Sequence, residues 1–314
     1  MTEPLLHAGT ARPGDAGEEA DPDVEHPGGF WSDAWRRLRG RPLFWVASAI
    51  ILVLLVMAVF PSLFTAVDPR AADLAGSGAT PGPDAPLGRD LQGRDVYARA
   101  IYGAGPTLAV GVLATLGTVL LGALAGLLGG YRGGWPDSLL SRFAEVFAGL
   151  PFVLGGIVIL TTYNPPGQLV GESRLVVQVV ATIVVLSWPM AMRIMRAATI
   201  TARDQDYVRA ARALGAGRLR VVFRHILPNT LAPVLVYATI QLGAFIGAEA
   251  TLSFLGIGLK DPVVSWGVMI AESQDRVAQI PHAILFPAGF LVVTVLAFVM
   301  LGDAVRDALD PRGR

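Results

Sequence analysis

The sequence predicts an all-α polytopic membrane protein with six transmembrane helices. Hydrophobic residues make up 53% of the 314-residue chain and charged residues only 16%, a composition too apolar for a water-soluble domain of this size. In addition, six segments lack Asp, Glu, Lys and Arg over about 20 residues, the helix length that crosses the hydrocarbon core. They are residues 42–67, 101–131, 146–171, 175–192, 226–248 and 277–302.

These segments fit membrane spans better than buried helices or a signal sequence. A soluble protein can bury one helix that is apolar all round, but six in one chain point to the bilayer. The first segment starts about forty residues into the chain and is too long for a signal-peptide core, with no small-residue cleavage site behind it. We therefore expect it to remain as an anchor.

The basic residues set the expected orientation. The formal net charge is zero, so the placement of the charges carries the information. With a cytoplasmic N-terminus, 18 of the 25 lysines and arginines fall on the cytoplasmic side of the spans. Loops rich in positive charge stay in the cytoplasm. Both termini are therefore predicted to be cytoplasmic.

Composition divides the chain into five segments. The first is rich in Pro, Gly, Asp and Glu, which predicts disorder. Trp31, Trp35 and the arginines after them suit the headgroup zone, and residues 90–102 are expected to form a short surface helix. The predicted segments are a disordered cytoplasmic tail (1–30), an interfacial anchor with the first transmembrane helix (31–67), an extracytoplasmic loop (68–100), a transmembrane core with a cytoplasmic loop at 201–229 (101–303) and a cytoplasmic C-terminal tail (304–314).

The longest cytoplasmic loop, residues 201–229, is predicted to form a helix, a turn and a second helix. Asp206 suits the first helix N-terminus, and Gly215 and Gly217 end that helix. Pro228 marks the end of the second helix or a kink into the fifth span. Helical spacing places Tyr207, Ala210, Ala211 and Leu214 on one face of the first helix, and Leu219, Val222, Phe223 and Ile226 on one face of the second.

This loop suits contact with another surface. Its alanines permit close approach, and arginines at 209, 212, 218, 220 and 224 surround them with positive charge. A helix that docks on a protein and a helix that lies on anionic lipid both have this composition. The composition alone leaves the two alternatives open.

The loop also resembles a known motif. Ala210, Ala211 and Gly215 form the pattern AAxxxG, and HILPN follows at residues 225–229. The combination resembles the EAA loop of ABC importer permeases, the coupling helix that sits in a cleft on the ATPase subunit. The resemblance implies an ATPase-coupling role for Arg209, Ala210, Ala211, Gly215, His225, Leu227 and Pro228.

Four further segments resemble the C-type permease subunits of dipeptide, oligopeptide and nickel importers, and they occur in the same order. They are LGRDLQGRDVYAR (87–99), GGYRGGWPD (129–137), ATLSFLGIGLKDPVVSWGVM (250–269) and LGDAVRDALDPR (301–312).

The resemblance implies a type I ABC importer permease fold in the inner (plasma) membrane of the cell. It also implies a subunit that forms half of the translocation pathway, with peptides as the first cargo class and nickel or another small solute as the alternative. The implied partners are a second permease subunit in a heterodimer, two ATPase subunits and an extracytoplasmic substrate-binding protein, with membrane lipid around them.

The chain departs from the family pattern at three places. Arg209 stands where the EAA motif has glutamate, so a polar contact made by that glutamate is not expected here. Val299 stands where the final span usually has asparagine, and GAGPTL at 103–108 lacks the usual basic residue.

The sequence predicts no chemistry of its own for this chain. It has no cysteine, and Lys260 does not lie in the Gly-Lys-Ser/Thr sequence of an ATP-binding loop. The four histidines are scattered along the chain. We expect no catalytic, cofactor or metal site, with ATP bound by partner subunits. The rival class, a transporter driven by an ion gradient, needs ionisable groups within its spans, and the predicted spans are nearly free of charge.

Glu249 is the acidic residue most deeply embedded in apolar sequence, close to the fifth span. A charge in the bilayer is costly unless it meets a partner or a water-filled cavity. Two interpretations follow, a pathway or gate residue and a hydrogen-bonded or snorkelling carboxylate at the membrane interface. Gln178 and Gln241 are weaker pathway candidates, and the glycines of the second span are expected to pack helices.

Overall fold

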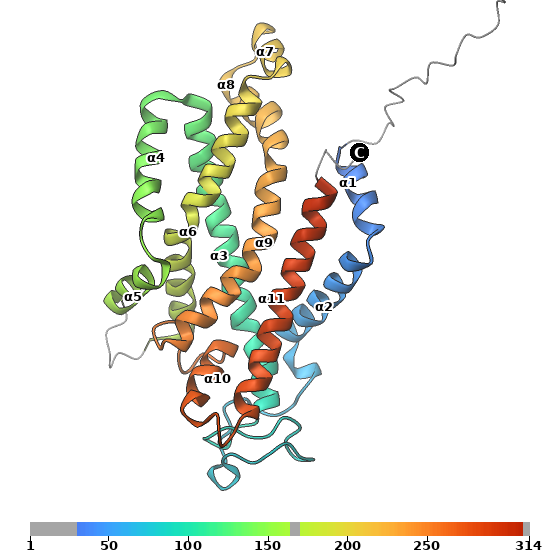
Figure 1. Ribbon diagram of the computed structural model, residues 1–314, viewed down its shortest axis with the longest axis vertical. Helices are drawn as coiled ribbons and strands as arrows, with labels where there is room; N and C mark the ends of the chain where they lie inside the picture. The colour runs from blue at the N-terminus through green and yellow to red at the C-terminus, as the bar shows by residue number, and fades with distance from the viewer. Residues whose placement is uncertain (1–29, 164–169, 310–314) are drawn as a thin grey trace, which may run out of the picture.

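The computed structural model describes residues 30–163 and 170–309, and no β-strand occurs among them. Most helices lie roughly along one long axis (Figure 1). Within the described residues, five helical runs are long and apolar enough to cross a membrane, and one bent pair supplies a sixth. The five are α2 (Pro42–Val59), α3 (Val96–Arg132), α6 (Glu172–Arg203), Arg218–Phe254 with α9 (Leu227–Phe254), and α11 (His282–Leu309). The all-α membrane class is therefore confirmed.

Helices α3 and α6 form the close-packed centre of the fold. A Cβ atom on Gly126 would lie 2.4 Å from the carbonyl oxygen of Met192, and one on Gly122 would lie 2.5 Å from the Cβ of Ala191. Only glycine permits this approach of two helix backbones. The prediction that these glycines pack helices is confirmed.

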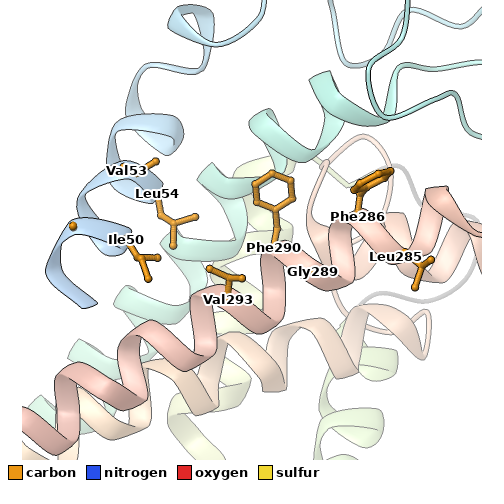
Figure 2. Close-up of a pocket in the computed structure, with 9 residues that line it drawn as sticks. Ile50, Val53, Leu54, Leu285, Phe286, Gly289, Phe290 and Val293 are labelled. Atoms are coloured by element: carbon orange, nitrogen blue, oxygen red, sulfur yellow. The ribbon is translucent and has the colours of Figure 1, made fainter. Parts of the chain in front are cut away.

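Helices α2 and α11 lie beside one another on one flank, next to α9 and α3 (Figure 1). Buried side chains from all four helices share one hydrophobic core. Between α2 and α11 lies an apolar groove of about 520 Å³. Figure 2 shows Ile50 and Leu54 of α2 facing Phe290 and Val293 of α11 across it. Such a wholly apolar lining suits the hydrocarbon core of a membrane.

The third predicted span, residues 146–171, is wrong in its bounds and in its shape. Helices α4 (Gly134–Ala148) and α5 (Phe152–Tyr163) instead meet at 90°. Gly149 and Pro151 lie in the break, where proline has no N–H to donate and disfavours helical geometry in the residue before it. The last residues of the predicted span, 164–169, lie outside the described part of the chain.

Three other predicted bounds also need correction. The first span ends at Val59 rather than at 67. Helix α3 begins at Val96, inside the predicted loop 68–100, so the structure has no separate surface helix over residues 90–102. Helix α11 continues to Leu309, into the predicted tail. The predicted disorder of residues 1–29 and the last five residues of the C-terminal tail lie outside the described residues, and α1 (Phe30–Arg39) starts at the next position.

A cluster of four buried or partly buried charges fastens the loop before α3 to α10 (Trp266–Ser273). The guanidinium groups of Arg94 and Arg99 both donate to Glu272, at 2.6 and 2.8 Å, and both donate to Asp90, at 2.7 and 3.1 Å. Burial raises the pKa of Glu272, and the charge of Arg94 opposes that shift. Each charge therefore has partners of opposite sign, as a buried ion requires.

The predicted cytoplasmic loop lies at the opposite end of the molecule. It contains α7 (Asp206–Ala213), α8 (Arg218–Val221) and a π-helical segment, η3 (Val222–Ile226). Helix α1 and the end of α11 lie toward this same end (Figure 1). The short helices thus lie beyond the ends of the long helices α3, α6 and α9.

Candidate functional site

Helix α7 packs on the ends of the long helices through two small apolar side chains. Val208 is fully buried and Ala211 is 9% exposed. Val208 shares a hydrophobic cluster with Met195 of α6 and with Ile226 at the start of the α9 run. This contact fixes α7 against α6, which precedes the loop, and against the helical run that continues into α9 after it.

The opposite side of α7 is open to its surroundings. Tyr207, Ala210 and Leu214 are exposed, Leu214 to 88%. We call these three residues the α7 outer face. The prediction that Ala211 shares this face is wrong. Ala211 lies three residues after Val208, so the two are neighbours on the helix surface and both are buried. An apolar face of this kind at the end of a membrane protein is available for a protein partner.

The turn after α7 is a Schellman motif centred on Gly215. The Ala216 N–H donates to the carbonyl of Ala211 at 3.0 Å, and the Gly215 N–H donates to the carbonyl of Arg212 at 3.0 Å. Gly215 has φ of +81°, in the left-handed region that glycine adopts at little cost. The prediction that the first helix of the loop ends at Gly215 is confirmed.

The second half of the loop runs without a stop into α9. Pro228 lies in the first turn of α9, so it marks a junction rather than the end of a helix. Proline has no N–H and its ring crowds the carbonyl four residues earlier, which accounts for the wider π turn just before it. The side-chain amide of Asn229 donates to the carbonyl of His225 at 2.6 Å. This bond supports the backbone where the regular ladder is interrupted.

The stripe predicted on this second helix divides into two sides. Val222 and Ile226 are buried in the cluster that holds Val208, whereas Leu219 and Phe223 are 74% and 60% exposed. Half-buried Leu227 packs against the same cluster. The buried half anchors the loop, and the exposed half adds to the apolar surface at this end.

Polar contacts connect the loop to the centre of the fold. The guanidinium of Arg203, the last residue of α6, donates to the carbonyl of Gly130 in α3 at 2.6 Å. About two helical turns earlier in α6, Arg196 donates to both carboxylate oxygens of Asp137 in α4. A force on α7 therefore reaches α6 directly and α3 and α4 through these bonds.

Arg209 points away from the buried side of α7. Its guanidinium lies 3.7 Å from the carboxylate of Asp206, and both side chains are largely exposed. Such a surface pair contributes about 1 kcal/mol or less. Arg209 is thus placed to meet a partner rather than to hold the loop together.

Glu249 is fully enclosed within the chain. One carboxylate oxygen accepts hydrogen bonds from the hydroxyls of Ser253 at 2.8 Å and Ser265 at 3.0 Å. These contacts fasten α9 to the segment that enters α10. The second carboxylate oxygen of Glu249 is buried and has no hydrogen-bond partner among the described residues, so the hydrogen-bonded alternative holds for one oxygen only. Gln178 is half-buried and lines a pocket of about 410 Å³ between α5 and α6.

Sequence reasoning missed two features of the site and its support. Val208 was not singled out, although its spacing from Ala211 is helical and would have marked the buried side. The charge cluster of Asp90, Arg94, Arg99 and Glu272 joins segments far apart in the sequence, and no local pattern pairs them. No group of three or more metal-ligating side chains occurs in the part of the chain that the structure describes.

Two family models match the chain. Residues 118–314 match the binding-protein-dependent transport system inner membrane component family. Residues 29–81 match the N-terminal transmembrane domain of oligopeptide transport permease C.

Several characterised proteins are similar over most of their length. The dipeptide transport system permease protein DppC of Alkalihalophilus pseudofirmus is 35% identical, covering 90% of this chain and 90% of the relative. The oligopeptide transport system permease protein OppC of Bacillus subtilis is 33% identical, covering 91% and 90%. The glutathione transport system permease protein GsiD of Escherichia coli is 34% identical, covering 90% of each.

Solved structures share the fold at lower sequence identity. A chain of the MetNI methionine ABC transporter, crystallised in inward-facing conformations, superposes with a TM-score of 0.53 at 21% identity and covers 67% of this chain and 96% of its own. A chain of an amino acid ABC transporter superposes with a TM-score of 0.52 at 20% identity, covering 67% and 93%. With the family models and the relatives, these likenesses identify the chain as a multi-pass inner-membrane permease subunit that belongs to the binding-protein-dependent transport system inner membrane component family.

Proposed function

We propose that this permease subunit imports peptides and that the α7 outer face transmits the work of ATP hydrolysis to its spans. The observation that carries the proposal is the exposure of Tyr207, Ala210 and Leu214 on a helix whose other side is fixed to α6 and α9. A partner that binds this face and moves therefore moves α7 together with the ends of α6 and α9.

The cargo assignment rests on the relatives. Their names record dipeptide, oligopeptide and glutathione transport, and all three are peptides. We assign the same chemical class to this chain. Nickel or another small solute is the competing cargo and forms one arm of the experiment below.

The assembly consists of this chain, a second permease subunit, two ATPase subunits and an extracytoplasmic binding protein. The two permeases enclose the pathway between them, and both termini and α7 lie in the cytoplasm. ATP binds between the ATPase subunits, and this chain binds no cofactor. Closure of the ATPase subunits draws the coupling loops together and reverses the side on which the pathway is open.

Each residue of the coupling loop has a role that follows from its place. Ala210 and Arg209 meet the ATPase subunit, and Ala211 lets α7 lie close to the long helices. Gly215 closes the turn that orients α7. His225, Leu227 and Pro228 form the junction that passes motion into α9. Glu249 acts as a positioning residue that keeps α9 and the α10 segment together as the pathway opens.

Reconstitution tests the transport function. The two permeases and two ATPase subunits are placed in proteoliposomes with ATP inside, and the binding protein and a radiolabelled dipeptide are added outside. We expect accumulation that requires ATP and ceases when the phosphate-binding lysine of the ATPase subunit is replaced. Accumulation driven by an ion gradient without ATP contradicts the ATP-driven mechanism. Uptake of radioactive nickel in place of every peptide tested contradicts the cargo assignment.

A further inference from the structure

A further pocket lies beside the coupling loop, apart from the α7 outer face. It measures about 750 Å³, within the range of sites that hold small molecules. The end of α3 forms one wall, and α8 with the π-helical segment forms the other. Its lining combines apolar and basic side chains, with Leu124, Leu127, Leu128, Val222 and Phe223 among the apolar residues and Arg132, Arg212 and Arg218 as the basic ones.

The three arginines of this pocket are available for an anionic ligand. All three side chains are exposed, and no carboxylate pairs with any of them among the residues that the structure describes. The Arg212 guanidinium lies 5.6 Å from the centre of the Tyr131 ring, which holds it at the pocket. Three positive charges with no carboxylate partner around one cavity favour a phosphate group.

The apolar wall of the pocket continues along α3 into the membrane span. Leu116, Leu120, Leu124 and Leu128 follow one another at intervals of four residues and are 60%, 64%, 57% and 44% exposed. Residues four apart lie one above another on a helix. The stripe therefore leads from the arginines toward the hydrocarbon core, as an acyl chain attached to a bound headgroup requires.

We propose that this pocket binds an anionic phospholipid from the leaflet at the α7 end, with its phosphate among Arg132, Arg212 and Arg218 and one acyl chain along the leucine stripe. Basic pockets at the cytoplasmic ends of membrane helices bind anionic headgroups. A soluble phosphate would use the arginines but has no need of the leucines. The bound lipid would brace α8 against α3, and the proposal does not depend on the cargo.

The test uses the full transporter in nanodiscs that contain equal amounts of phosphatidylglycerol and phosphatidylcholine. Native mass spectrometry of the released complex measures which lipid is retained. We expect wild-type complex to retain phosphatidylglycerol in preference to phosphatidylcholine. Removal of each basic residue near a membrane surface costs about a fivefold loss of affinity, so the double variant Arg132→Gln with Arg218→Gln should retain about 30-fold less. Arg220→Gln is the matched control, because Arg220 is exposed on the same helix and does not line the pocket.

The outcomes separate the possible occupants. Preferential retention that the double variant loses and Arg220→Gln keeps supports the lipid site. Equal loss in Arg220→Gln overturns it in favour of a diffuse basic surface. Equal retention of both lipids by the wild type also overturns it, as does displacement of phosphatidylglycerol by inorganic phosphate alone. If the double variant loses the ATPase subunits but retains phosphatidylglycerol as the wild type does, the pocket binds the ATPase subunit and the lipid proposal is overturned.

Discussion

Replacement of Gly215 by valine perturbs the coupling loop at one backbone position. Gly215 has φ of +81°, and beyond its two chain neighbours no atom lies within 4 Å of the place where a Cβ would stand. The added side chain therefore meets open space and strains only the backbone. A side chain in the left-handed region costs roughly 1–2 kcal/mol, with β-branched residues least tolerated.

This cost acts on the two hydrogen bonds of the Schellman turn, which join Ala216 to Ala211 and Gly215 to Arg212. A change of 1–2 kcal/mol shifts the balance between the closed turn and its open alternatives by about 5- to 30-fold. When the turn opens, the α7 outer face no longer has a fixed orientation. We expect ATP-driven uptake to fall, with this factor as the upper bound on the loss.

The assay compares three variants at equal amounts in the membrane. Gly215→Val is tested beside Gly215→Asn, because asparagine tolerates the left-handed region. Gly217→Val is the second control, since Gly217 has φ of −64° and open space around it, so a side chain fits there. Peptide uptake and copurification of the ATPase subunits are measured for each.

The expected order of activity is wild type, then the two controls close to it, then Gly215→Val well below. The spans should insert normally in all variants, because their burial does not depend on this turn. Uptake and ATPase recovery at the wild-type level in Gly215→Val would refute the coupling role of the turn. An equal loss in Gly217→Val would show that any added side chain in the loop is harmful, which also refutes the argument from φ.

Three further predictions follow from packing, charge and topology. Gly126→Leu should reduce the yield of folded complex in size-exclusion chromatography, because overpacking costs about 1–3 kcal/mol and a Cβ there would already lie 2.4 Å from the backbone of α6; a normal yield would contradict the close packing. Arg99→Gln should lower the thermal midpoint of the purified complex, since unpairing a buried cluster costs about 3–5 kcal/mol, whereas the exposed Arg142→Gln should cost about 1 kcal/mol or less; equal midpoints would contradict the role of the cluster. A cysteine at exposed Ser77 should react with an impermeant thiol reagent from outside, and a cysteine at Gly217 should react only after the membrane is opened. The chain itself has no cysteine, so it gives no background labelling. Labelling at Gly217 from outside would contradict the predicted topology.

The membrane spans could be predicted because hydropathy and charge report directly on the surrounding solvent. The bend between α4 and α5 could not be predicted from hydropathy, because the residues next to it, 146–148 on one side and 152–154 on the other, are all apolar. Gly149 and Pro151 were the available signal for the break. The observed helix ends differ from the predicted ones for a related reason. Helix α3 begins among charged residues because Arg99 is neutralised by Asp90 and Glu272, and that pairing exists only in the folded chain.

The coupling loop was predicted in outline but not in the direction of its faces. Its turn at Gly215 follows from local backbone chemistry, which a sequence carries. The buried side of α7 depends on what Val208 meets, and those partners come from α6 and the start of α9. The pairing of Glu249 with Ser265 is likewise tertiary, so the sequence left its two interpretations open.

Site-specific crosslinking at Leu214 tests the central claim most directly. Leu214 is 88% exposed on the α7 outer face, so a photoreactive amino acid fits there without disturbing the packing. Leu74 serves as the control, since it is 75% exposed and belongs to the segment between α2 and α3, which lies at the opposite end of the molecule (Figure 1). Irradiation of membranes that contain the whole transporter, followed by sequencing of the products, should give a crosslink from position 214 to a subunit with an ATP-binding loop, and none from position 74. Crosslinks from position 214 to lipid alone, or to no ATP-binding subunit, would contradict the account.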